Sequence, residues 1–157
     1  MFRDFLDIDD GTTAMDFMVQ ERERGITIRS AAISFNWLGH QINLIDTPGH
    51  VDFSGEVTRS LRVLDGVVTI LDAVKGVESQ TQKVWAQATK HKIPKLVFLN
   101  KMDRIGSSAS QSINSLRNRL GVDPLVLQIP LGDGDSFKGV IDLLDLEQIL
   151  FAGRYGQ

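Results

Sequence analysis

Two short apolar runs, each followed at once by polar residues, dominate the pattern of this chain. The first covers residues 42–45, broken only by Asn43, and leads into Asp46, Thr47, Pro48, Gly49 and His50. The second covers residues 95–99 and leads into Asn100, Lys101, Met102 and Asp103. Apolar runs of this length are typical of buried strands of a parallel sheet, and ligands of such sheets bind beyond the carboxyl ends of the strands. We therefore expect both polar clusters at one rim of an α/β sheet.

The remaining segments alternate between strand and helix patterns. Strands are predicted where β-branched and apolar residues cluster between turns, at residues 26–36, 41–46, 66–72, 95–100, 125–131 and 137–144. The first two are expected to form a β-hairpin. Helices are predicted from a capping box at residues 13–23, and from apolar residues on one face at residues 54–64, 78–91 and 107–120. Gly121 is a predicted C-cap of the last helix.

Composition narrows the class of protein. The chain has 157 residues, enough for one domain with its own core, and its formal net charge of −3 offers no bulk attraction to nucleic acid. No cysteine is present, so disulfides and thiolate metal sites are excluded. No apolar stretch is long enough to span a membrane. The acidic residues near Met1 do not fit a transit or secretory peptide. Neither a membrane nor DNA is an expected partner.

The two polar clusters differ in how specific they are. Residues 46–50 read either as an ordinary Asp-x-Pro-Gly turn or as a site for a phosphate and its metal ion. The Asn-Lys-x-Asp cluster suits guanine, because the Asp103 carboxylate can accept hydrogen bonds from both the ring N–H and the exocyclic amine. Adenine lacks that ring N–H, so a buried carboxylate would be left unpaired and would reject the wrong base. Both clusters together favour a guanine nucleotide site.

These residues carry a resemblance to a known family. Residues 46–50 and 100–103 resemble the third and fourth signature motifs of translational GTPases, and residues 24–28 resemble their first switch. Residues 51–53 and 59–66 are similar to the elongation factor G branch. The opening residues 7–11 and 16–18 are most similar to the mitochondrial ribosome-releasing members of that branch. The resemblance covers about residues 5 to 145, and Ser54 with Gly55 departs from the bulkier pair usual in these factors.

The resemblance implies an architecture. We expect an α/β, P-loop NTPase-like GTPase domain, with a mixed, mostly parallel sheet and helices on both faces. It would be incomplete, because the strand that carries the phosphate cradle is missing. Residues 1–130 would form a partial GTP-binding domain. Residues 131–157 would begin the inserted subdomain of the elongation factor G type, which elongation factor Tu lacks.

The resemblance also implies roles for single residues, with GTP and Mg²⁺ as cofactors. Asp46 would hold Mg²⁺ through water and Thr27 would complete the metal shell. The Gly49 N–H would contact the γ-phosphate. Its neighbours Thr47, Pro48 and His50 would also lie at the nucleotide, and His50 would be catalytic. His50 would orient the attacking water, as a neutral or a protonated imidazole. Guanine would be read by Asn100, Lys101 and Asp103, with Met102 between them.

A further expectation concerns GTP affinity, because the sequence lacks a motif that binds phosphates. No Gly-x-x-x-x-Gly-Lys-Ser/Thr cradle occurs in it. Charge-assisted hydrogen bonds contribute roughly 1.5 to 3 kcal/mol each, so losing several would weaken GTP binding by powers of ten. We expect this chain alone to bind GTP poorly and to turn it over negligibly, and we expect it to be a fragment of a longer factor.

Several functions stay open from the sequence. The first is the GTP-binding and GTP-hydrolysing portion of a translation factor that releases or recycles ribosomes in mitochondria, with the ribosome and ribosome recycling factor as partners by resemblance. The second is an elongation factor G acting in translocation. The third is a catalytically dead interaction module that keeps the surface of the fold without its nucleotide chemistry. A nucleotide-free α/β domain of other function is disfavoured by the Asn-Lys-x-Asp motif.

Overall fold

The computed structural model describes residues 31–46 and 61–151. The described residues belong to two compact units. The first contains residues 31–46, 61–65 and 87–92, and the second contains residues 66–86 and 93–151. The predicted helix at residues 13–23, the first turns of the helix predicted at residues 54–64, and the start of the first predicted strand lie outside the described residues.

A β-hairpin makes up most of the described part of the first unit. Strands β1 (Ala31–Trp37) and β2 (His40–Asp46) pair antiparallel, from Ala31 opposite Asp46 to Trp37 opposite His40. The connecting residues Leu38 and Gly39 both have positive φ, 48° and 81°, as a two-residue turn with matching twist requires. The predicted hairpin is confirmed in this range. Leu61–Val63 form a short 3-10 helix.

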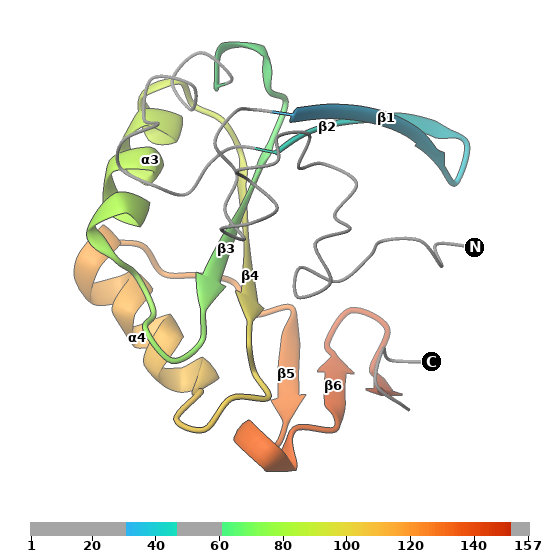
Figure 1. The fold of residues 1–157 in the computed structure, drawn as a ribbon, viewed down its shortest axis with the longest axis vertical. Helices are drawn as coiled ribbons and strands as arrows, with labels where there is room; N and C mark the ends of the chain where they lie inside the picture. Colours follow the sequence, from blue (N-terminus) through green and yellow to red (C-terminus); the bar gives the residue numbers. More distant parts are fainter. Residues whose placement is uncertain (1–30, 47–60, 152–157) are drawn as a thin grey trace, which may run out of the picture. The chain divides into compact units, whose positions relative to one another are not determined.

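A parallel pair of strands forms the centre of the second unit. Strand β3 (Val67–Asp72) pairs with β4 (Lys95–Asn100), with Val67 opposite Lys95 and Asp72 opposite Asn100. Helix α3 (Ser79–Lys90) follows β3 and helix α4 (Ala109–Leu120) follows β4, as the sequence predicts. Figure 1 shows both helices on the same side of the strand pair.

Helix α4 begins and ends at the residues that its sequence indicates. The Ser108 hydroxyl accepts a hydrogen bond from the backbone N–H of Gln111, 3.3 Å away. At the other end Gly121 has φ 66° and donates its N–H to the carbonyl of Arg117. Both caps satisfy backbone groups that a helix end leaves unpaired, so they fix the length of α4.

The core lies between the strand pair and the helices. Leu71, Val77 and Leu116 are buried together. Partly buried residues of β4, of α4 and of the segment after it pack around them: Val97, Leu99, Leu120 and Val122. Every second residue of β3 and β4 faces this cluster, because side chains of a strand alternate between its two faces.

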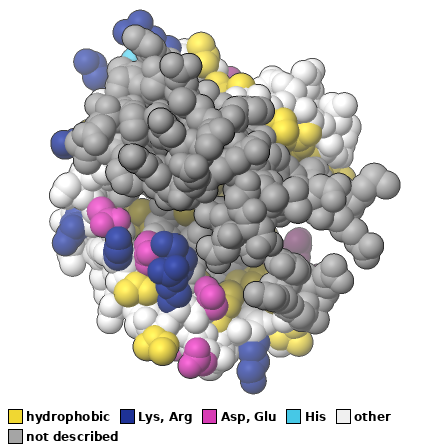
Figure 2. Space-filling model, in the orientation of Figure 1, with side chains coloured by type: hydrophobic (Ala, Val, Ile, Leu, Met, Phe, Trp, Pro, Cys, Tyr) yellow, Lys and Arg dark blue, Asp and Glu magenta, His cyan; other side chains and the backbone are white. Residues whose placement is uncertain are grey.

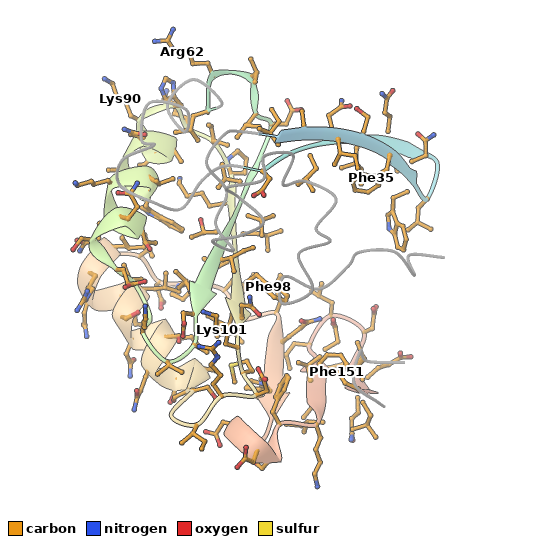
Figure 3. All side chains as sticks on the ribbon, viewed as in Figure 1. Phe35, Arg62, Lys90, Phe98, Lys101 and Phe151 are labelled. Carbon is orange, nitrogen blue, oxygen red and sulfur yellow. The ribbon has the colours of Figure 1, made fainter. Side chains whose placement is uncertain are left out.

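The opposite face of the same strand pair is exposed. It carries Val68 and Ile70 of β3 and Leu96 and Phe98 of β4, the last of which is labelled in Figure 3. The apolar runs predict buried strands. Among the described residues this face of the pair is exposed, whereas the other face packs against Leu116 of α4.

A small antiparallel sheet ends the described chain. Strands β5 (Gln128–Leu131), β6 (Gly139–Asp142) and β7 (Glu147–Leu150) pair in that order. The strand predicted at residues 125–131 therefore begins three residues late and pairs with β6 instead of extending the parallel pair. Gly134–Ser136, between β5 and β6, form a short 3-10 helix.

The described strands thus form three separate sheets, of which β3 and β4 make the one parallel pair. The α/β class with an incomplete sheet is confirmed. No helix among the described residues is long and apolar enough to cross a membrane.

Candidate functional site

The carboxyl ends of β3 and β4 lie at one rim of the parallel pair. Asp72 is the last residue of β3 and stands opposite Asn100, the last residue of β4. The Asn100 carbonyl accepts the N–H of Ala73, so the two chains remain bonded one step past the strands. Lys101 follows directly and is labelled in Figure 3. Parallel pairing therefore brings the predicted guanine motif beside an acid that the sequence did not single out.

Asp72 and Lys101 form an ion pair. The Lys101 ammonium Nζ donates to Oδ2 of Asp72 at 2.9 Å, and the Lys101 and Asp72 side chains are 39% and 13% exposed, respectively. The other carboxylate oxygen accepts the backbone N–H of Val74, also at 2.9 Å. The Lys101 hydrogen bond, followed by the Val74 N–H, lowers the pKa of Asp72 against the opposing effect of its burial. The carboxylate is therefore charged and fixed at neutral pH.

Hydrogen bonds and a buried side chain hold the loop that carries Asp103 in place. Met102 is buried, and its carbonyl accepts the Ser107 hydroxyl at 2.7 Å and the Gly134 N–H at 2.9 Å. The Ser108 N–H donates to the carbonyl of Ala73, which ties the end of the loop to the end of β3. A loop with a buried anchor and paired backbone groups presents its exposed side chains in a defined geometry.

Asp103 is the exposed member of the motif. Within the described part of the chain, its side chain has no hydrogen-bond or ion-pair partner. Asn100 is also exposed, and its Oδ1 accepts the N–H of Lys101 at 2.8 Å. An unpaired carboxylate can accept two hydrogen bonds, as the edge of guanine requires. The site thus contains one carboxylate already satisfied, Asp72, and one still available, Asp103.

The phosphate and metal side of the predicted site is described only at Asp46. This residue ends β2 in the first unit, whereas Asn100, Lys101 and Asp103 lie in the second. Thr27, Thr47, Pro48, Gly49 and His50 lie outside the described residues. Among the residues that the structure describes, no three His, Cys, Asp or Glu side chains gather as metal ligands. The placement of Mg²⁺ stays a prediction.

Charges on the described surface are mixed in sign on the face that Figure 2 shows. Figure 2 shows Lys and Arg side chains interspersed with Asp and Glu over the described part of the visible face. The described residues on this face form no broad basic patch of the kind that binds nucleic acid through its phosphates.

Comparison with known proteins identifies the family. Residues 4–153 match the family model of the elongation factor Tu GTP binding domain. The chain belongs to this family. The predicted resemblance to translational GTPases is thereby confirmed.

Relatives of this GTP-binding domain place it near the elongation factor G branch. The chain is 59% identical over 145 residues to the mitochondrial ribosome-releasing factor 2 of Bos taurus, covering 92% of the chain and 19% of that protein. It is 51% identical over 150 residues to elongation factor G of Petrotoga mobilis, covering 96% of the chain and 22% of that protein. The chain therefore spans about a fifth of the length of these relatives.

A solved structure shares the fold of this GTP-binding domain. A crystal structure of a protein from Thermus thermophilus superposes with a TM-score of 0.82 at 26% identity, over 94% of the chain and 22% of that protein. The α/β assignment and the incompleteness of the domain agree with this match.

Asp72 is the site residue that sequence reasoning missed. It ends an apolar run just as Asp46 and Asn100 do, and the same pattern could have identified it. The run at residues 66–72 predicts only a structural strand when it is read alone, because the residues after Asp72 match no nucleotide motif.

Proposed function

We propose that this chain is the guanine-reading portion of the GTP-binding domain of a ribosome-acting translation factor, and that the factor releases or recycles ribosomes in mitochondria. The rim of β3 and β4 supports the first part, because one hydrogen-bonded loop carries both the available carboxylate of Asp103 and the side chain of Lys101, which Asp72 binds. The name of the relative from Bos taurus, mitochondrial ribosome-releasing factor 2, supports the second part.

Three residues would read the base. Asp103 would accept the two N–H groups on the edge of guanine, and the stem of Lys101 would lie along the ring plane. Asn100 would keep the loop in place through its bond to the N–H of Lys101. The observation that carries this assignment is the unpaired, exposed Asp103 carboxylate on the same loop as Lys101, which is already paired with Asp72.

The remaining predicted residues would act at the phosphates. Asp46 and Thr27 would hold Mg²⁺, which supplies charge neutralisation at the phosphates when it is bound. The backbone of residues 47–49 would contact the γ-phosphate, and His50 would orient the attacking water. Catalysis by such a site is positioning and charge stabilisation, so each of these groups matters through its placement.

The small antiparallel sheet supports a domain assignment. Residues 131–157 would begin an inserted subdomain, after a partial GTP-binding domain at residues 1–130. Strands β6 and β7 both lie after this boundary and pair with each other, although β5, which begins at Gln128, pairs with β6 across it.

A second function that the sequence leaves open is a catalytically dead interaction module, which would keep the surface of the fold without its nucleotide chemistry. Such a module would not need to discriminate between purine bases. Base selectivity therefore separates the two proposals.

The experiment exploits the chemistry of Asp103. The 157-residue chain, labelled with ¹⁵N, is titrated with guanosine, adenosine and xanthosine while amide shifts are recorded. Guanosine should shift residues 100–103 in a saturable way at millimolar concentration, and adenosine should not. In Asp103→Asn the new amide can donate to the 2-oxo group of xanthosine, so the preference should change from guanosine to xanthosine.

A matched control is Asp145→Asn, which changes an exposed aspartate of the β6–β7 turn. It should keep the preference for guanosine. Equal shifts with guanosine and adenosine would contradict the proposed reading of guanine and would favour the interaction module.

A further inference from the structure

We propose that Asp72 is a positioning residue for guanine recognition, which acts by holding the Lys101 side chain where the base binds. This inference rests on the proposed function of the rim. It adds a residue from β3 to a motif whose other members all follow β4.

The first argument is the register of the parallel pair. Asp72 stands opposite Asn100, so β3 delivers its last side chain to the start of the guanine motif. A shift of β3 by one residue would turn Asp72 to the other face of the sheet. The core contacts of Leu71 prevent such a shift, since they fix which residues of β3 point toward α4. The packing of the core therefore places the carboxylate.

The second argument is that the carboxylate is itself anchored. Oδ1 accepts the Val74 N–H, and the Asp72 carbonyl accepts the N–H groups of Lys75 and Gly76, at 3.1 Å and 2.8 Å. The side chain is 13% exposed. An anion held by its own turn is a fixed point, whereas the lysine that it binds has a long, flexible stem. The anchored Asp72 carboxylate therefore restricts the position of the Lys101 side chain.

The third argument is the backbone of Lys101, whose φ is 63°. Positive φ is uncommon outside glycine and occurs often at ligand clamps. The other described non-glycine residues with positive φ lie in turns between strands, Leu38 and Leu146, or after the end of a helix, Lys92. Lys101 instead follows a parallel strand directly. The chain turns there as it leaves β4, and the Lys101 side chain at this turn reaches Asp72.

The consequence for binding is preorganisation. A free lysine side chain would have to be ordered when the base binds, and that ordering would reduce affinity. Asp72 orders it beforehand. Asp72 makes no contact with the hydrogen-bonding edge of the base in this proposal, so it should affect affinity without changing the preference for guanine.

The test uses Asp72→Asn in the full 157-residue chain. Asparagine keeps an oxygen for the Val74 N–H and removes the negative charge. The probe is guanosine, because removing an anion would attract the phosphates of a nucleotide and hide the effect. Binding is followed by the amide shifts of residues 100–103, and folding by thermal melting. Asp72→Asn should weaken guanosine binding about fivefold, near the upper end for a partly exposed ion pair.

The matched control is Asp142→Asn. Asp142 also ends a strand, accepts a backbone N–H two residues on, from Leu144, and accepts a side-chain donor, from Gln128. It lies at the end of β6 and not beside the guanine motif. Its replacement should leave guanosine binding unchanged, which separates positioning of Lys101 from a general loss of strand-end bonds.

A double-mutant cycle decides whether Asp72 acts through the lysine. Lys101→Met keeps an apolar stem and removes the ammonium, so Asp72→Asn should have no further effect on guanosine binding in that background. Equal weakening by Asp72→Asn in both backgrounds would overturn the inference, as would unchanged binding in the single variant. If the wild-type chain shows no saturable guanosine binding, the proposed function fails and this inference fails with it.

Discussion

The two faces of the β3–β4 pair carry similar apolar residues but differ in burial. One, the covered face, packs against α4, and the other, the bare face, is exposed. On one face Leu71, Val97 and Leu99 pack against α4, where Leu116 is 2% exposed. On the other face Ile70 and Phe98 are 64% and 57% exposed. Hydrophobicity is therefore not what distinguishes the faces. What distinguishes them is that a helix packs against only one of them. The rim with the guanine motif lies at the carboxyl ends of both strands.

This difference shows which contacts hold the site in place. The covered face supplies the apolar burial that fixes the register of β3 against β4. The rim adds hydrogen bonds, from Lys101 to Asp72 and from Ser107 to Met102. The bare face contributes little of either among the described residues. The loss of stability caused by a substitution should therefore decrease from the covered face to the rim and then to the bare face.

The largest effect is expected on the covered face. Leu116→Ala removes a buried side chain from the cluster of Leu71 and Val77 and should reduce the free energy of unfolding by about 2 to 5 kcal/mol. Urea unfolding followed by circular dichroism measures it. Leu96→Ala, on the bare face, is the matched control and should cost far less. Equal losses would show that the two faces do not differ energetically.

The next largest loss of stability is expected at Gly76, whose backbone lies close to the Ser115 side chain of α4. Gly76 has φ 66°, and an added Cβ would lie 2.6 Å from Oγ of Ser115, which accepts the N–H of Val77. Gly76→Ala should therefore destabilise the chain by about 2 to 3 kcal/mol through backbone strain and this clash.

Gly121→Ala separates the two causes. Gly121 also has φ 66° but has open space around it, so its replacement should show the backbone strain alone, about 1 kcal/mol. If both variants lose the same stability, the contact between the loop and α4 is not tight.

A smaller effect is expected at the rim as the pH changes. Lys101 lowers the pKa of Asp72 below its ordinary value of 3.8, so the folded state favours the ionised acid. The pair should therefore add stability above pH 3.8, and this stability should be lost as the pH falls through the lowered pKa. Its size should be about 0.2 to 1 kcal/mol, because Lys101 is partly exposed.

Comparison of the wild type with Asp72→Asn between about pH 2 and pH 7 measures this contribution. The difference in stability between the two should be present at neutral pH and shrink in acid. A difference that does not depend on pH would contradict the charge of the pair as its cause.

The smallest change in stability is expected on the bare face. Ile70→Lys combined with Phe98→Lys replaces exposed side chains and should alter the free energy of unfolding by only about 0.5 kcal/mol. It should nevertheless reduce self-association, because exposed apolar patches promote contact between molecules. Sedimentation velocity measures this. Unchanged association would indicate that the bare face does not mediate contacts in solution.

The elements of the second unit were largely predictable from the sequence. The run from Lys95 to Asn100 predicts the strand bounds directly, and Gly121 marks the end of α4, because both signals are local. The assignment of Gln128–Leu131 to a separate antiparallel sheet was not predictable. Strand pairing depends on distant partners, and an apolar run does not specify them.

The site followed the same division. Asn100, Lys101 and Asp103 form a contiguous motif, so the sequence was sufficient to find them. Asp72 lies far from them along the chain and joins them only through the parallel register of β3 and β4. A contact between strands of this kind requires the fold.

The most direct test of the rim as a guanine site is a chemical-shift map of the ¹⁵N-labelled chain with guanosine and with adenosine. Guanosine should perturb two segments far apart in sequence, the end of β3 at residues 72–74 and the loop at residues 100–103, with one shared dissociation constant, while adenosine leaves both unchanged. Shifts that are absent at either segment, or that adenosine reproduces, would contradict it.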